Sequence, residues 1–210
     1  MPDDATPDLP HHPSAVAARD AASLLVLRQT SSGPALLMGM RGAGHRFMPN
    51  RLVFPGGSVD AGDLAAPAAS PLTPLTRARL EKAASPELAH GLAIAAAREL
   101  EEETGLSLGA PPELAGLHYL CRMVTPPGRP IRFNARFLLV TAEAVSGTIA
   151  GSGELEELRF YGMEEALRLR IAEPQQRVIE RLRAWLAMSE AERAAETAMP
   201  VYHRRVWESE

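Results

Sequence analysis

The sequence predicts a mixed α/β fold of the α+β kind, in which a mixed β-sheet lies between helices that pack on its faces. Strand-like apolar runs interleave with helical segments, and they do so without the regular βαβ rhythm of a parallel sheet. Two pairs of strand candidates are joined by short turns that contain Gly and Pro. With 210 residues, of which 46% are hydrophobic, the chain can bury the core of one such domain.

The first part of the chain predicts a tail, a hairpin and a strand that stops at glycine. Residues 1–18 hold four prolines and no apolar periodicity, so we expect a flexible N-terminal tail. Two apolar runs around residues 31–34 (SSGP) predict a β-hairpin. Residues 51–57 (RLVFPGG) predict a short strand that runs into a loop, where the glycines allow close approach of another backbone.

An Ala- and Pro-rich segment leads into the most clearly delimited helix. Thr73 and Ser85 each precede a proline, the pattern of an N-cap followed by the first helical residue. These signals predict a short helix over 75–84 and a longer helix that begins after Ser85. The longer helix is expected to end at Gly105, which suits a left-handed C-cap.

The rest of the chain completes the sheet and its helices. GLHYLCRMV and IRFNARFLLV predict two strands joined by the PPG turn at 126–128, and EELRFYGMEEAL predicts a strand that passes into a helix. An amphipathic helix follows at 174–188. We therefore expect one domain over 19–200, an insertion within it over 64–90, and a C-terminal tail over 201–210.

Composition excludes several classes of protein. A net charge of −4 argues against broad nucleic-acid binding, which needs a basic face. The single cysteine, Cys121, excludes an internal disulfide and a multi-cysteine metal site. The chain has no apolar run of membrane-spanning length, and its acidic N-terminus lacks the features of a signal peptide. We expect a cytoplasmic protein without a membrane or nucleic-acid partner.

Acidic residues crowd the C-terminal end of the longer predicted helix. At about 100° per residue, Glu99, Glu102 and Glu103 share one face, whereas Glu101 points elsewhere. The helix dipole disfavours these charges, they repel one another, and their face borders an apolar stripe. A solvated acidic face is one interpretation. A bound hard cation is the other, and oxygen ligands alone suit Mg²⁺ or Mn²⁺.

Residues 98–106 (RELEEETGL) resemble the second half of the Nudix box, the signature of the Nudix hydrolases. Gly57 and Asp63 resemble its first half, with aspartate where the family usually has glutamate. The family normally has seven residues between that acid and the arginine, whereas residues 64–97 intervene here, an insertion of 27 residues. With FPGG before the box and TP and RFNARFLL after it, the chain is similar to the peroxisomal coenzyme A diphosphatase branch and its bacterial relatives.

The resemblance implies a Nudix-type α/β/α sandwich and a divalent-metal-dependent hydrolase. Its reaction would cleave the diphosphate linkage of a nucleoside diphosphate derivative, with coenzyme A or acyl-coenzyme A favoured. ADP-ribose, NADH and nucleotide sugars stay open as substrates. A catalytically inactive Nudix-fold ligand sensor is the alternative from another class, although the box carboxylates that such domains lose are present here. Many relatives are dimers, so a homodimer is a candidate assembly.

The resemblance also assigns roles within the box. The implied ligands of Mg²⁺ or Mn²⁺ are Glu99, Glu102, Glu103 and the backbone carbonyl of Gly57. Gly56 and Asp63 would support the loop, although the two glycines can also mark a tight turn alone.

Arg98 precedes the first carboxylate. Its guanidinium can fold back on a carboxylate or a loop carbonyl, or it can be a surface arginine. The general base stays open as well. Glu102 or Glu103 can serve, but metal-bound acids are weaker bases, so Glu154 in GSGELEEL is a competing candidate unless it is an ordinary loop acid.

Five residues outside the box are candidates for substrate binding. Arg41 ends the predicted hairpin, and Arg46 and Phe47 follow in a glycine-bearing loop that can hold phosphate and an adenine ring, or can be plain solvent loop. Arg132 and Arg136 lie four positions apart on a predicted strand, hence on one sheet face. They can clamp a phosphate or pair with acids.

Overall fold

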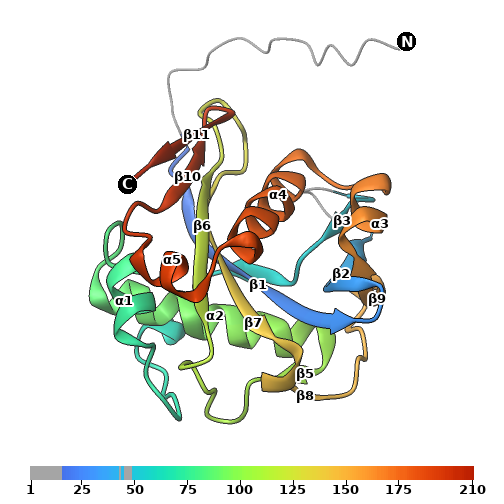
Figure 1. Ribbon diagram of the computed structural model, residues 1–210, viewed down its shortest axis with the longest axis horizontal. Helices are drawn as coiled ribbons and strands as arrows, with labels where there is room; N and C mark the ends of the chain where they lie inside the picture. Colours follow the sequence, from blue (N-terminus) through green and yellow to red (C-terminus); the bar gives the residue numbers. More distant parts are fainter. Residues whose placement is uncertain (1–15, 43, 45–48) are drawn as a thin grey trace.

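A computed structural model describes residues 16–42, 44 and 49–210 (Figure 1). Most of the expected N-terminal tail, and the predicted substrate residues Arg46 and Phe47, lie outside the described residues. Among the described helices, none has the length and hydropathy needed to cross a membrane.

One mixed sheet organises the molecule. Its strands run in the order β11-β10-β6-β7-β1-β2-β3, while β4 pairs with β1 and β9 pairs with β2. The strands are β1 (Arg19–Thr30), β2 (Gly33–Arg41), β3 (Leu52–Val53), β4 (Gly56–Ser58), β6 (His118–Val124), β7 (Phe133–Thr141), β9 (Leu155–Gly162), β10 (Pro200–His203) and β11 (Val206–Ser209). Because β1 and β7 are parallel while β1 and β2 are antiparallel, the mixed sheet predicted from sequence is confirmed.

Helices cover both faces of this sheet (Figure 1). They are α1 (Pro74–Leu80), α2 (Pro86–Thr104), α3 (Met163–Arg168), α4 (Glu173–Ala187) and α5 (Glu190–Ala195), with 3₁₀ turns η1 (Ala61–Leu64) and η2 (Ala142–Ala144). A separate short pair joins β5 (Leu106–Ser107) to β8 (Ser146–Gly147). The helices α2 and α4 lie on opposite faces and bury two hydrophobic clusters, which confirms the predicted layered arrangement.

Alternation along β1 explains why there are two clusters. Leu24 and Val26 pack in the α2 cluster, whereas Leu25 and Leu27 pack in the α4 cluster. Successive side chains of a strand point to opposite faces, so a continuous apolar run serves two cores at once.

Local capping signals set the bounds of α2. The Ser85 side chain accepts a hydrogen bond from the Leu88 backbone N–H, and Pro86 occupies the first turn. Gly105 adopts the left-handed conformation with φ of 73° at the C-cap. The predicted helix between Ser85 and Gly105 is therefore confirmed, whereas the short helix expected over 75–84 is α1 and ends at Leu80.

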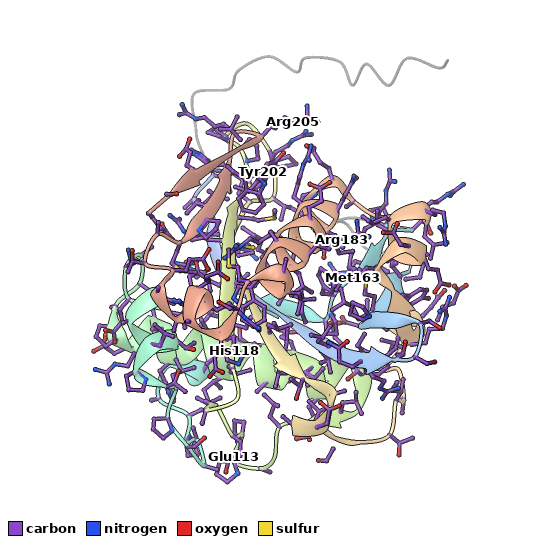
Figure 2. All side chains as sticks on the ribbon, viewed as in Figure 1. Glu113, His118, Met163, Arg183, Tyr202 and Arg205 are labelled. Carbon is purple, nitrogen blue, oxygen red and sulfur yellow. The ribbon has the colours of Figure 1, made fainter. Side chains whose placement is uncertain are left out.

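The C-terminal residues, expected as a tail from 201, instead form the β10 and β11 hairpin at the edge of the main sheet (Figure 2). Tyr202 is buried and pairs in register with Met123 of β6. The hairpin turns at Arg204 and Arg205, both with positive φ. Hairpin turns of this kind usually carry Asn or Gly, so the sequence lacks the signal that normally reveals them.

Candidate active site

The carboxylates at the end of α2 meet the glycine loop of β4. Glu103 is only 1% exposed. One of its oxygens accepts a hydrogen bond of 2.9 Å from the Gly56 backbone N–H, and the other lies 3.6 Å from a guanidinium nitrogen of Arg41. A hydrogen bond between residues 47 positions apart thus joins the loop to the helix.

Both glycines of this loop lie in close contact with their neighbours. A Cβ at Gly57 would lie 2.2 Å from a carboxylate oxygen of Glu99. At Gly56, where φ is 154°, a Cβ would lie 2.5 Å from the Ala22 carbonyl oxygen. A side chain at Gly56 would clash with fixed backbone, and one at Gly57 would displace the Glu99 carboxylate, so the two glycines let the loop backbone approach the carboxylates.

Arg98 connects the helix, the loop and the start of the insertion. Its Nε and Nη2 donate to the two carboxylate oxygens of Asp63, each at 3.1 Å, and Nη2 also donates to the Ser58 carbonyl at 3.0 Å. Its Nη1 lies 2.9 Å from Glu99 and 3.0 Å from Glu102. The hydrogen bond to Asp63 raises the pKa of Arg98 above its ordinary value. The guanidinium thus folds back on carboxylates and on a loop carbonyl together.

The insertion leaves Asp63 in place. Asp63 is 4% exposed, and besides binding Arg98 it accepts a 2.8 Å hydrogen bond from the Asp60 backbone N–H. The chain after it folds back over the N-terminal half of α2, where His90 is 2.8 Å from the Ala66 carbonyl oxygen. The detour therefore lies along the helix, and the two halves of the box still meet.

Burial makes the carboxylate cluster electrostatically costly. It raises the pKa of the Glu103 carboxyl to about 8, although the Gly56 N–H and Arg41 act in the opposite direction. Burial also raises the pKa of Glu99. The negative charge of Glu154, which precedes β9, raises the pKa of both groups, so this loop acid lies within electrostatic range of the cluster.

The donor set of this cluster fits a hard divalent cation by chemistry. The cluster offers carboxylate oxygens as ligands. Burial disfavours the ionised form of two of these carboxylates, Glu99 and Glu103, and a positive charge beside them offsets that cost. Within the described part of the chain, no three His, Cys, Asp or Glu side chains stand together as a ready metal cage. Arg98 and Arg41 supply the positive charge that faces these carboxylates.

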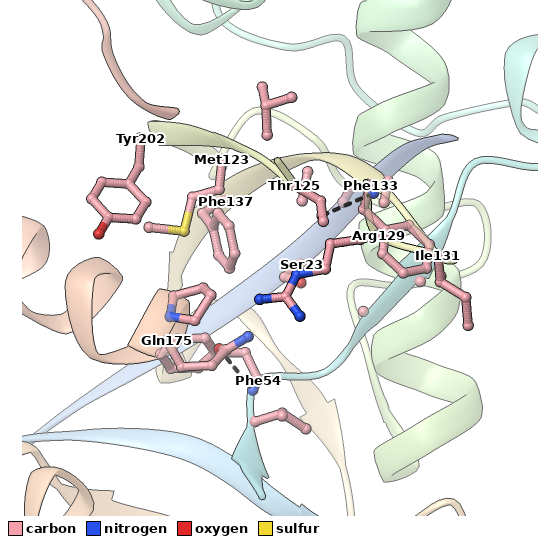
Figure 3. Close-up of a pocket in the computed structure, with 18 of the residues that line it drawn as sticks. Ser23, Phe54, Met123, Thr125, Arg129, Ile131, Phe133, Phe137, Gln175 and Tyr202 are labelled. Carbon is pink, nitrogen blue, oxygen red and sulfur yellow. Dashed lines mark hydrogen bonds between the residues drawn. The ribbon is translucent and has the colours of Figure 1, made fainter. Parts of the chain in front are cut away.

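A pocket of about 580 Å³ opens beside the glycine loop (Figure 3). Its apolar lining includes Phe54, Met123, Phe137 and Tyr202. Gln175 of α4 closes part of the wall and accepts a 3.4 Å hydrogen bond from the Phe54 backbone N–H. Sequence reasoning did not single these residues out. The alternation of Phe133, Ala135 and Phe137 along β7 was the one available signal for an apolar face.

The predicted substrate residues separate in the structure. Arg41 lines the pocket, and its Nε is buried with no hydrogen-bond partner among the described residues. Arg136 is 1% exposed, forms an ion pair with Asp20 and donates a 2.7 Å hydrogen bond to the Ala83 carbonyl. Arg132 donates to the carbonyls of Thr125 and Val16.

Neither Arg132 nor Arg136 lines the pocket. The structure therefore does not bring these two to the substrate region predicted for them. Arg136 instead joins the insertion, at the Ala83 carbonyl, to the start of β1, at Asp20, which is a structural contact.

The comparisons agree with this fold. A family model of the NUDIX domain matches residues 87–182. This segment holds the second half of the box, and the structure brings Gly57 and Asp63 to it from outside. No curated protein sequence matches the chain.

Several solved structures are similar. A NUDIX hydrolase from Alicyclobacillus acidocaldarius is 23% identical, with a TM-score of 0.61 over 78% of this chain and 90% of that one. A MutT NUDIX hydrolase from Burkholderia pseudomallei is 18% identical, with a TM-score of 0.53 over 80% of this chain and 99% of that one. The Nudix hydrolase RenU from M. smegmatis is 19% identical, with a TM-score of 0.51 over 84% of this chain and 96% of that one.

At these identities the solved structures establish the fold, which is the mixed α/β Nudix fold. The domain match thus covers residues 87–182 of a chain with this fold, and the structure gathers the box residues around Arg98.

Proposed function

We propose that this protein is a Mg²⁺- or Mn²⁺-dependent hydrolase that cleaves the diphosphate linkage of coenzyme A or an acyl-coenzyme A. The observation that carries the proposal is the buried Glu103, which is held against the Gly56 loop beside a pocket of substrate size. A buried carboxylate with a raised pKa is typical of a functional site.

The metal would be held by Glu99, Glu102, Glu103 and the Gly57 carbonyl. When bound, it neutralises the diphosphate and activates a water molecule. The chain's own residues position these ligands. Arg98 donates hydrogen bonds to Glu99 and Glu102 on the helix, and its hydrogen bond to the Ser58 carbonyl holds the glycine loop against α2.

Glu154 is our choice of general base. It is exposed, precedes β9, and adds its charge to that of Glu99 and Glu103 without belonging to the helix. As water attacks phosphorus, its carboxylate would take the proton while the bridging P–O bond breaks and a phosphate monoester leaves. Glu102, which is also largely exposed, is the competing base.

Coenzyme A is favoured because the pocket combines an apolar lining with arginines. Arg41 lies at the end nearest Glu103, where its unpartnered Nε can donate to a phosphate oxygen. The Phe54, Met123 and Phe137 side chains offer an apolar surface to a base or a hydrocarbon arm.

A substrate panel tests the proposal. Coenzyme A, acetyl-coenzyme A, ADP-ribose, NADH and diadenosine polyphosphates are incubated with Mg²⁺ or Mn²⁺, and products are separated by chromatography. We expect coenzyme A to yield adenosine 3′,5′-bisphosphate and 4′-phosphopantetheine, and chelation of the metal to stop the reaction. Preferred cleavage of ADP-ribose or NADH would contradict the coenzyme A assignment, and cleavage of none would favour a ligand sensor.

A further inference from the structure

The pocket follows a single row of paired residues across five strands. Ser58 of β4 pairs with Ala21 of β1, which pairs with Ala135 of β7, then Met123 of β6 and Tyr202 of β10. All five line the pocket. Strands lie about 4.8 Å apart, so the row runs roughly 19 Å from the glycine loop to the C-terminal hairpin. A substrate whose diphosphate lies at Glu103 therefore has its remaining groups directed along this row.

Three arginines line the pocket, and two of them are matched by acids. Arg41 faces Glu103 at the glycine-loop end. Arg205 lies 3.0 Å from Glu173, which also accepts a 2.8 Å hydrogen bond from the Tyr202 hydroxyl at the hairpin end. The third arginine, Arg129, has neither a hydrogen bond nor an ion pair with any described residue of the chain.

The position of Arg129 allows its positive charge to contact a ligand in the pocket. Arg129 lies in the connection between β6 and β7, and its side chain reaches over the pocket (Figure 3). Gly128, with φ of 85°, directly precedes Arg129, and Pro130 directly follows it and restricts the Arg129 backbone. Arg129 is exposed, so its guanidinium is accessible to a ligand, and the planar fork of this group matches the oxygens of a phosphate.

We propose that Arg129 recognises a phosphate monoester that the substrate carries outside its scissile diphosphate. The inference rests on the proposed function for the place of the diphosphate, at Glu103 and Gly57. The strands that Arg129 connects, β6 and β7, lie two to three strand spacings from β4, or about 10–14 Å. That separation exceeds the length of a diphosphate, so Arg129 selects nucleotides with a further phosphate on the ribose.

Binding of hydrolysis-resistant ligands tests this inference without any catalytic step. Adenosine 3′,5′-bisphosphate and AMP are titrated into the metal-free protein by calorimetry, and the ratio of their dissociation constants is compared between variants. We expect the wild type to bind the bisphosphate about tenfold more tightly or better, the increment of a charged hydrogen bond. In Arg129→Gln the two dissociation constants should become about equal, and in Arg129→Lys part of the preference for the bisphosphate should remain.

Arg77→Gln is the matched control. Arg77 is an exposed arginine of α1 outside the pocket, so the variant loses the same charge and should keep the wild-type ratio. The inference is overturned if the wild type does not prefer the bisphosphate, if Arg129→Gln keeps the preference, or if it weakens both ligands equally. A protein that keeps the preference but hydrolyses no panel substrate would refute the proposed function alone.

Discussion

Glu103→Gln is expected to lower the metal-dependent turnover of the preferred substrate by about 100-fold or more. Glu103 is a buried carboxylate in contact with the glycine loop, and glutamine removes its charge with little change of shape. Turnover is measured by chromatography at saturating Mg²⁺. Glu101→Gln is the matched control, because Glu101 is exposed on the same helical turn and binds Ser107 rather than the cluster.

The fold should survive this substitution. The amide oxygen can still accept the Gly56 N–H bond. Because burial raises the pKa of Glu103 to about 8, the metal-free folded protein keeps this carboxyl protonated where the unfolded chain ionises it, so the free energy of unfolding falls as the pH rises from about 4.5 toward 8. The neutral amide avoids that cost, so the variant should melt no lower than the wild type at neutral pH. Turnover within a few-fold of wild type would refute the role of Glu103.

Arg98→Ala is expected to lower both stability and activity. The substitution leaves Asp63 buried without its guanidinium partner and frees the Ser58 carbonyl. Breaking a buried pair in this way costs about 3 kcal/mol of unfolding free energy, somewhat less where one partner is partly exposed, as Arg98 is. Urea denaturation without metal measures the loss.

A double-mutant cycle with Asp63→Asn separates this pair from other effects of Arg98. If the two side chains act on each other, the double variant should lose clearly less free energy than the two single variants added together. Arg98→Lys keeps the charge but not the fork, and should recover only part of the stability. Strict additivity, or a loss below about 1 kcal/mol for Arg98→Ala, would contradict the account.

The parts of the fold that could be predicted depend on local signals. Ser85, Pro86 and Gly105 set the ends of α2 through contacts within a few residues, so the sequence alone delimits the helix and orients its carboxylates. The pairing of Asp63 with Arg98 depends on residues 35 positions apart, and spacing cannot show that the intervening chain folds back along α2.

The residues that line the pocket could not be predicted, because they come together through the register between strands. The pocket row joins Ala21, Ala135, Met123 and Tyr202 from four strands, and no local pattern states which residues become neighbours. The expectation that Arg132 and Arg136 share a sheet face did not reveal which face it is. Arg136 proved to lie away from the pocket, because Asp20 and the Ala83 carbonyl bind it there.

The central claim, that the α2 carboxylates hold a divalent metal, is tested most directly by Mn²⁺ binding followed by electron paramagnetic resonance. Titration of wild-type protein should remove the signal of free Mn²⁺ until the site is filled. The Glu99→Gln, Glu102→Gln and Glu103→Gln triple variant should leave the signal free, while Glu101→Gln should bind as the wild type does. Equal Mn²⁺ binding by the wild type and the triple variant, or no binding by the wild type, would contradict the claim.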